Sequence, residues 1–228
     1  MRAGLVIANY LVRYLFFAIG IFLMSIGIAL TVHAGLGTTP ISSIPAVLAV
    51  ASPLSFGTWT ALFNVALVIL QIVLLRRCYP LFQLLQLPAS FLFGALCDLS
   101  LWLTRGFTFD HYGAQALVSL AGTVVLGIGV WTQITPKVLN LAGEGAVIAV
   151  STVVGKVFGK VKVVFDWTLV GLAVASSLLL MGRVEAVREG TLVSAVLVGI
   201  LVRLFSRKLP FLARWTQPLH RTGQGADS

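Results

Sequence analysis

The chain has 228 residues, of which 58% are apolar and only 10% are charged, and its formal net charge is +9 at pH 7. A soluble domain carries about 25% charged residues, so this composition excludes a water-soluble globular protein and predicts an integral membrane protein. The basic residues are scattered between apolar runs and form no single stripe. This argues against nucleic acid as a partner and favours membrane lipids, whose anionic headgroups attract basic cytoplasmic loops.

Six apolar runs are long enough to cross a bilayer, because about 20 helical residues span its hydrocarbon core. The first run is longer than a signal peptide, so we expect it to be retained. The pattern predicts an all-α polytopic protein with one membrane domain over residues 1–206 and a basic, interfacial and partly disordered cytoplasmic tail over 207–228. The predicted spans are Tyr14–Val32, Thr58–Leu75, Leu87–Leu103, Ala114–Thr132, Val163–Met181 and Thr191–Phe205.

Two shorter apolar stretches, Ile41–Ala51 and Ala146–Phe158, follow the glycine-rich turns Gly35–Pro40 and Leu141–Gly145. They are too short to span a bilayer and too apolar to lie in water. Irregular backbone at membrane depth is tolerated only against protein or a wet cavity. The sequence therefore predicts that both stretches are re-entrant segments or half-helices.

The distribution of positive charge predicts the orientation of the chain. With six spans, both ends lie on the same side of the membrane, and that side would carry 13 of the 16 lysines and arginines. The other side would carry only Arg105, Arg183 and Arg188. Because cytoplasmic loops are enriched in lysine and arginine, we expect a bacterial inner or plasma membrane protein with both termini in the cytoplasm.

The two halves of the chain match weakly at an offset near one hundred. Ile26-Gly27 corresponds to Ile128-Gly129, and Phe63-Asn64 corresponds to Phe165-Asp166. The matches predict two repeats, about 14–103 and 114–205, with three spans each. An odd number of spans inverts the second repeat in the membrane, as in many secondary transporters, whose binding sites lie at the repeat interface near broken helices.

Several short motifs resemble the YitT/YczE-like family of bacterial membrane proteins. They are the turn Gly35-Leu-Gly-x-x-Pro40, the pattern Gly94-x-x-x-Asp98, and the second-half motifs Gly143-Glu-Gly145 and Val187-Arg-Glu-Gly-Thr191. The chain departs from many relatives at Ile41-Ser42, where they carry an aromatic and an acidic residue. The resemblance spans about residues 14–206. It implies a duplicated multi-pass membrane protein, with no agreed substrate or reaction.

Three acidic residues are the main candidates for chemistry, since a charged side chain inside a membrane is costly and faces a partner or water. Asp98, eleven residues into the third span, is either a substrate or proton site or a structural acid paired with Asn64, Gln133 or a lysine. Asp166, expected in the first turn of the fifth span, could act at a site or simply complement the helix dipole. Glu144 could bind a ligand or cap a helix.

The turns supply further candidates. Gly143 and Gly145 would let the backbone approach a ligand closely, and a nearby lysine could neutralise Glu144 or Asp166. The outer turn is either a seat for an anion at a half-helix start or an ordinary helix cap. The candidate substrate- or ion-binding residues are Glu144, Asp98, Asp166, Asn64, Gly37, Thr38, Thr39, Gly143, Gly145 and Lys160.

No catalytic motif or run of metal ligands occurs in the sequence, so we expect neither an enzyme nor a bound metal or cofactor. The leading hypothesis is a small transporter or permease for an unidentified small solute. Two alternatives are a solute-binding membrane subunit that needs an energising partner, and a non-transporting accessory or scaffold protein. The sequence leaves open whether the protein forms a homodimer.

Overall fold

Helices are the only regular secondary structure in the part of the chain that the computed structural model describes, which comprises residues 2–107, 109 and 111–208. Six of these helices are long and apolar enough to cross a membrane, which confirms the predicted all-α polytopic class. The six are α1 (Arg2–His33), α3 (Phe56–Leu75), α4 (Gln86–Leu103), α5 (Tyr112–Ile134), α7 (Phe158–Met181) and α8 (Glu189–Lys208). The predicted tail lies largely outside the described residues, beyond 208.

The remaining elements are two short apolar helices and two short 3-10 helices. The short apolar helices, α2 (Pro40–Ala51) and α6 (Ala142–Val154), follow the first and fourth spans, as predicted. The 3-10 helices, η1 (Arg76–Cys78) and η2 (Leu81–Leu85), form the connection from α3 to α4.

The largest differences from the predicted boundaries lie at the start of α1 and around α6. α1 begins at Arg2, twelve residues before the predicted Tyr14. The second apolar stretch was expected over Ala146–Phe158, but α6 begins at Ala142, so the expected turn over 141–145 is mostly the first turn of a helix. It ends before Gly155, whose backbone is left-handed (φ +66°), a common way to terminate a helix. α7 therefore begins at Phe158, five residues earlier than predicted.

α1 and α5 share the most extensive contact between two helices of the described structure and pack on each other at glycines. A Cβ atom added to Gly27 would lie 2.6 Å from the backbone nitrogen of Leu126, and one added to Gly129 would lie 2.6 Å from that of Met24. Membrane helices approach this closely where small residues line the interface. Because position 24 faces 129 and position 27 faces 126, the two helices run antiparallel.

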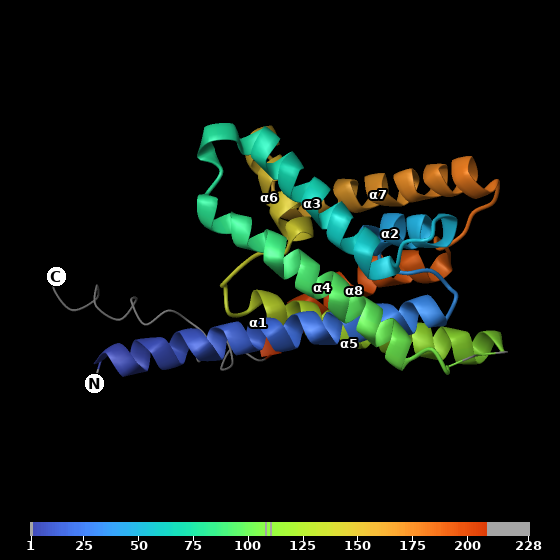
Figure 1. Ribbon diagram of the computed structural model, residues 1–228, viewed down its shortest axis with the longest axis horizontal. Coiled ribbons are helices and arrows are strands. Elements are labelled where there is room, and N and C mark those ends of the chain that lie inside the picture. The colour runs from blue at the N-terminus through green and yellow to red at the C-terminus, as the bar shows by residue number, and fades with distance from the viewer. Residues whose placement is uncertain (1, 108, 110, 209–228) are drawn as a thin grey trace.

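α8 packs on α5 and runs in the same direction. Gly190 lies against the hydroxyl of Ser119, and the rings of Trp131 and Phe205 lie 5.9 Å apart between centroids. Since α5 is antiparallel to α1, α8 ends at the end of the bundle where α1 begins (Figure 1).

The two short helices pack against the same two long helices and begin next to each other. α2 packs against α7 and α3, and α6 packs against α3 and α7 (Figure 1). Their first turns touch, because a Cβ atom added to Gly143 would overlap the side chain of Ile41. Pro40 and Ala142, where the helices begin, are both buried.

Helix boundaries recur along the chain at a nearly constant interval. α2 begins at Pro40 and α6 at Ala142, while α3 begins at Phe56 and α7 at Phe158, so each second helix begins 102 residues after the first. The packing follows the same correspondence. α1 packs on α4 as α5 packs on α8, and α2 packs on α7 as α6 packs on α3.

Candidate functional site

The first turn of α2 is buried and rich in hydroxyl groups. Thr39 donates a hydrogen bond from its hydroxyl to Ser42 Oγ (3.0 Å), and Ser43 Oγ donates to the carbonyl oxygen of Thr39 (2.9 Å). Thr39 holds the N-cap position, but its side chain makes no capping hydrogen bond. An ordinary helix cap was one of the two expected explanations for this turn, and the side chain of Thr39 does not supply it.

Gly37 and Thr38 serve the packing of the connection that leads to α2. The backbone of Gly37 is left-handed (φ +95°), and a Cβ atom there would meet the hydroxyl of Thr191 and lie 2.8 Å from the nitrogen of Arg188. The hydroxyls of Thr38 and Thr31 lie 3.3 Å apart, and Ser194 Oγ donates to the carbonyl oxygen of Thr38 (3.4 Å). These two residues hold the connection against α1 and α8.

Glu144 is the third residue of α6 and lies beside the first turn of α2. Gly143, on one side, presses against Ile41; on the other side, a Cβ atom added to Gly145 would lie 2.5 Å from Gln71 Oε1. The carboxylate oxygen Oε2 of Glu144 is buried and has no hydrogen-bond partner in the described part of the chain. Glu144 therefore lies within a helix rather than in the predicted turn, between glycines that permit close packing on α2 and α3.

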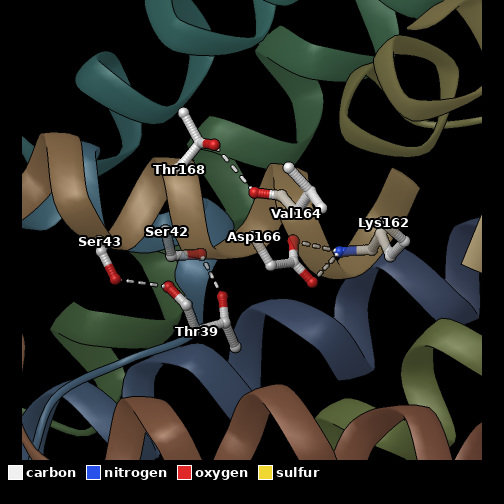
Figure 2. Close-up of polar contacts among 7 residues, drawn as sticks. All are labelled: Thr39, Ser42, Ser43, Lys162, Val164, Asp166 and Thr168. Atoms are coloured by element: carbon white, nitrogen blue, oxygen red, sulfur yellow. Dashed lines mark hydrogen bonds and ion pairs between the residues drawn. The ribbon is translucent and has the colours of Figure 1, made fainter. Parts of the chain in front are cut away.

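Lys162 and Asp166 form an ion pair on α7, one turn apart. Lys162 Nζ lies 2.5 Å from Asp166 Oδ1 and 2.6 Å from Oδ2, and Figure 2 draws the pair together with the hydroxyl groups of α2. Asp166 is in the third turn of α7, not the first, because the helix begins at Phe158. Its expected role at the helix dipole is therefore wrong. Both charges act electrostatically on Glu144, across the α6–α7 contact.

A pair of buried glutamines fixes the start of α6. Gln71 Nε2 donates both to Gln86 Oε1 and to the carbonyl oxygen of Ala142, each at 3.1 Å. Gln71 and Gln86 are both fully buried. Neither was among the candidate residues, although their polar side chains within or beside apolar spans are the kind of signal that marks an interior position.

Asp98 caps α3 and takes no part in the group around Glu144. Its Oδ2 accepts a hydrogen bond from Ser55 Oγ (2.6 Å), and its Oδ1 accepts one from the backbone nitrogen of Gly57 (2.7 Å). The expected partners Asn64 and Gln133 do not contact this carboxylate. Gln71 lies 14 residues beyond Gly57, about 21 Å along the helix, so Asp98 and Glu144 lie at opposite ends of α3.

The remaining candidates differ in their surroundings. Asn64 is buried at 6% exposure on the face of α3 that also carries Gly57 and Gln71, midway between the two ends. Lys160 is exposed, and Lys162 is the lysine that pairs with Asp166. A nearby lysine that neutralises Asp166 is therefore present, and it is Lys162 rather than the candidate Lys160.

Arginine side chains bind the backbone of both connections that lead to the short helices. Arg13, on α1, is buried and donates from Nε and Nη2 to the carbonyl oxygen of Pro136 (3.0 and 2.8 Å) before α6. Arg188, before α8, donates from Nη1 to the carbonyl oxygen of Gly35 (3.0 Å) before α2. A hollow of about 290 Å³, lined by Ile134 and residues 137–140, opens beside the connection that Arg13 holds.

Comparison with known proteins gives a family but no activity. A family described as a family of unknown function (DUF6198) matches residues 11–207. The chain is also similar to the uncharacterized protein YyaS of Bacillus subtilis (strain 168), with 28% identity over 213 residues that cover 92% of this chain and 99% of the relative. No solved structure matches the chain. A family of unknown function agrees with the resemblance in the sequence, but the match does not carry the YitT/YczE name.

Proposed function

The chain belongs to this family of unknown function, DUF6198, and we propose that it is a small membrane transporter or permease for a small solute. The observation that carries the proposal is the meeting of α2 and α6. Each is too short to span a bilayer, and their buried first turns touch at Ile41 and Gly143. Broken helices that meet inside a bundle are where transporters bind their solutes.

The residues around this meeting point suit a small polar solute. Ser42 supplies a hydroxyl on α2, Glu144 a carboxylate oxygen without a partner on α6, and Lys162 and Asp166 a pair of charges on α7. Ligand sites combine an apolar lining with a few convergent polar groups. We place the solute between the first turns of α2 and α6, and the proposal assigns no catalytic step to the chain.

We further propose that the fold is an inverted repeat of α1–α4 and α5–α8. The 102-residue recurrence of helix starts supports it, as does the exchange of packing partners between the halves. Each half contains three long apolar helices, so the second would insert upside down relative to the first. The 13-to-3 distribution of positive charge favours cytoplasmic termini in a bacterial plasma membrane.

The hydrogen bonds from Arg13 and Arg188 to the two connections, here called clamps, offer a way to open the protein to each side of the membrane separately. Arg13 holds the connection before α6, and Arg188 holds the one before α2, at opposite ends of the bundle. Releasing one clamp while the other stays closed would expose the meeting point to one side of the membrane at a time. In this proposal the structure corresponds to a state in which both are closed.

Accessibility of a cysteine at the meeting point tests the proposal without knowledge of the solute. Cys78 and Cys97 are first replaced by alanine, and Ser42→Cys is then introduced. In proteoliposomes, a membrane-impermeant thiol reagent should modify Cys at position 42 from either side, since the two connections open in turn. The reaction should be slow, because Ser42 is buried in the closed state.

Ser90→Cys is the matched control. Ser90 is fully buried on α4, where its hydroxyl donates to the carbonyl oxygen of Gln86 (2.6 Å), and it should not react from either side. Modification of position 42 from one side only would favour the solute-binding subunit over the transporter. Modification from neither side would favour the scaffold and would contradict transport through this point.

A further inference from the structure

Glu144 is the one acidic side chain near the meeting point that has no counter-ion of its own in the described structure. Lys162 and Asp166 already satisfy each other through two short contacts. The described residues of α2 and α3, which also pack around α6, contain no charged side chain, and the remaining charge on α7 near this level, Lys160, is exposed. An ionised Glu144 would therefore add an unbalanced negative charge to this group.

The physical cost of that charge decides the state of the carboxyl group. Oε2 is buried without a hydrogen-bond donor, and α6 belongs to an apolar bundle of membrane-spanning helices. An unpaired charge in such a medium costs several kcal/mol, and a carboxyl group avoids this cost by binding a proton. A neutral carboxylic acid can occupy the same position at far lower cost.

We propose that Glu144 is a proton-binding site that is protonated in the closed state and exchanges its proton with water when a connection opens. This inference rests on the proposed transport function, for which it makes the proton the coupling ion. On opening, the proton leaves the carboxyl group for water and the resulting carboxylate gains access to water and to Lys162. Binding of a proton restores the neutral group, and closure follows. Movement of the solute is thereby linked to the proton gradient.

Dicyclohexylcarbodiimide tests the proposal, because this apolar reagent enters membranes and adds to protonated carboxyl groups. The acid proton moves to a carbodiimide nitrogen, the carboxylate oxygen bonds to the central carbon, and the acyl group then migrates to nitrogen. The product contains all atoms of both reactants. Mass spectrometry of the purified protein in lipid should locate the adduct on Glu144. Above the midpoint, labelling should fall about tenfold for each pH unit.

Two variants on α7 should shift this pH profile in opposite directions. Lys162→Gln removes the cation that favours the ionised form, so labelling of Glu144 should persist to higher pH. Asp166→Asn frees Lys162 to pair with Glu144, so labelling should require lower pH. Lys160→Gln is the matched control on the same helix, and it should leave the profile unchanged because Lys160 is exposed. A purely structural role would not produce opposite shifts.

Infrared spectroscopy distinguishes an unprotonated group from one that the reagent cannot reach. The carbonyl band of a protonated carboxylic acid should be present in wild-type protein near neutral pH, absent in Glu144→Gln and retained in Asp98→Asn. Absence of this band in the wild type, labelling that does not change between about pH 5 and about pH 9, or shifts of the same sign in the two α7 variants would overturn the proposal. None of these results bears on the accessibility of position 42, so failure here is separable from failure of the transport function.

Discussion

Ile41 lies directly against Gly143, so that the first turns of α2 and α6 touch with no side chain of α6 between them. The contact joins two helices whose first residues are 102 positions apart in the sequence. The two contacting residues, at positions 41 and 143, are separated by the same 102 positions. A contact between two such equivalent positions lies where a twofold pseudo-symmetry axis of the proposed inverted repeat would pass.

The first prediction concerns this contact. Gly143→Ala should destabilise the folded protein by about 1–3 kcal/mol, because the added methyl group overlaps Ile41. The obstacle is a flexible side chain, so Ile41→Ala in the same protein should restore most of the loss. Thermal unfolding in mild detergent measures both effects. Gly171→Ala is the control, since a Cβ atom there meets nothing within 4 Å; an equal loss at this position would contradict the steric explanation.

The second prediction concerns the contact between α1 and α5. Gly129→Ala should also cost about 1–3 kcal/mol, but no side-chain replacement on α1 should rescue it, because the added Cβ atom would meet the backbone of Met24 as well as its side chain. Unfolding of Gly129→Ala with and without Met24→Ala checks this. Gly199→Ala, which has open space around it, should be neutral or slightly stabilising. Full rescue by Met24→Ala would show that the helix backbones are not in contact.

The third prediction assigns Asp98 to structure rather than transport. Asp98→Ala should destabilise the protein by about 1.5–3 kcal/mol, because hydrogen bonds to a charged acceptor are lost at the start of α3. Ser55→Ala should cost less, and the two changes should be non-additive, since both remove the same contact. The double-mutant cycle is measured by unfolding. Additive losses, or a loss of solute movement without a loss of stability, would return Asp98 to the functional site.

The fourth prediction tests whether α2 and α6 lie within the membrane. Ile44 and Ile148 are partly exposed on the surface of the protein. If the short helices lay in water, cysteines at these two positions would react with water-soluble reagents. We expect Ile44→Cys and Ile148→Cys, in a background without Cys97 and Cys78, to resist a membrane-impermeant maleimide. The positive control is a separate protein that lacks Cys97 but keeps the native Cys78, which is exposed in the connection from α3 to α4. Rapid modification of both positions would place the short helices in water.

The fifth prediction concerns orientation. Reporter fusions after Arg77 and Lys208 should report the cytoplasm, and a fusion after Gly182, between α7 and α8, should report the outside. The first two positions lie on the side that carries most of the positive charge. An external signal at Lys208 would reverse the proposed topology and exchange the sides that Arg13 and Arg188 control.

The spanning helices could be predicted from the sequence because hydropathy is a local property. The boundaries of α3 differ from the predicted Thr58–Leu75 by only two residues at one end. The start of α6 could not be placed in the same way. Gly143 and Gly145 suggested a turn, but in the structure they are small residues that let a helix pack closely on Ile41 and Gln71.

The candidate site was predictable in part. Glu144 and Asp166 were identified because acids in apolar stretches are costly, and both lie near the meeting of α2 and α6. The spacing of Lys162 and Asp166, four residues on a helix, indicates an ion pair, whereas Lys160 was chosen instead. The capping of α3 by Asp98 depends on how α3 and α4 pair, and no local pattern in the sequence reports that pairing.

The crossed packing of the short helices also constrains the order in which the chain can fold. α2 belongs to the first half but packs on α7, in the second half, and its hydroxyl-bearing first turn is buried in the complete bundle. During synthesis, α2 must therefore wait for more than 100 further residues to insert before it reaches its final environment. A chain that stops after α4 would lack α7, the helix on which α2 packs. Such a fragment should be a substrate for quality-control proteases unless a separately synthesised second half is supplied.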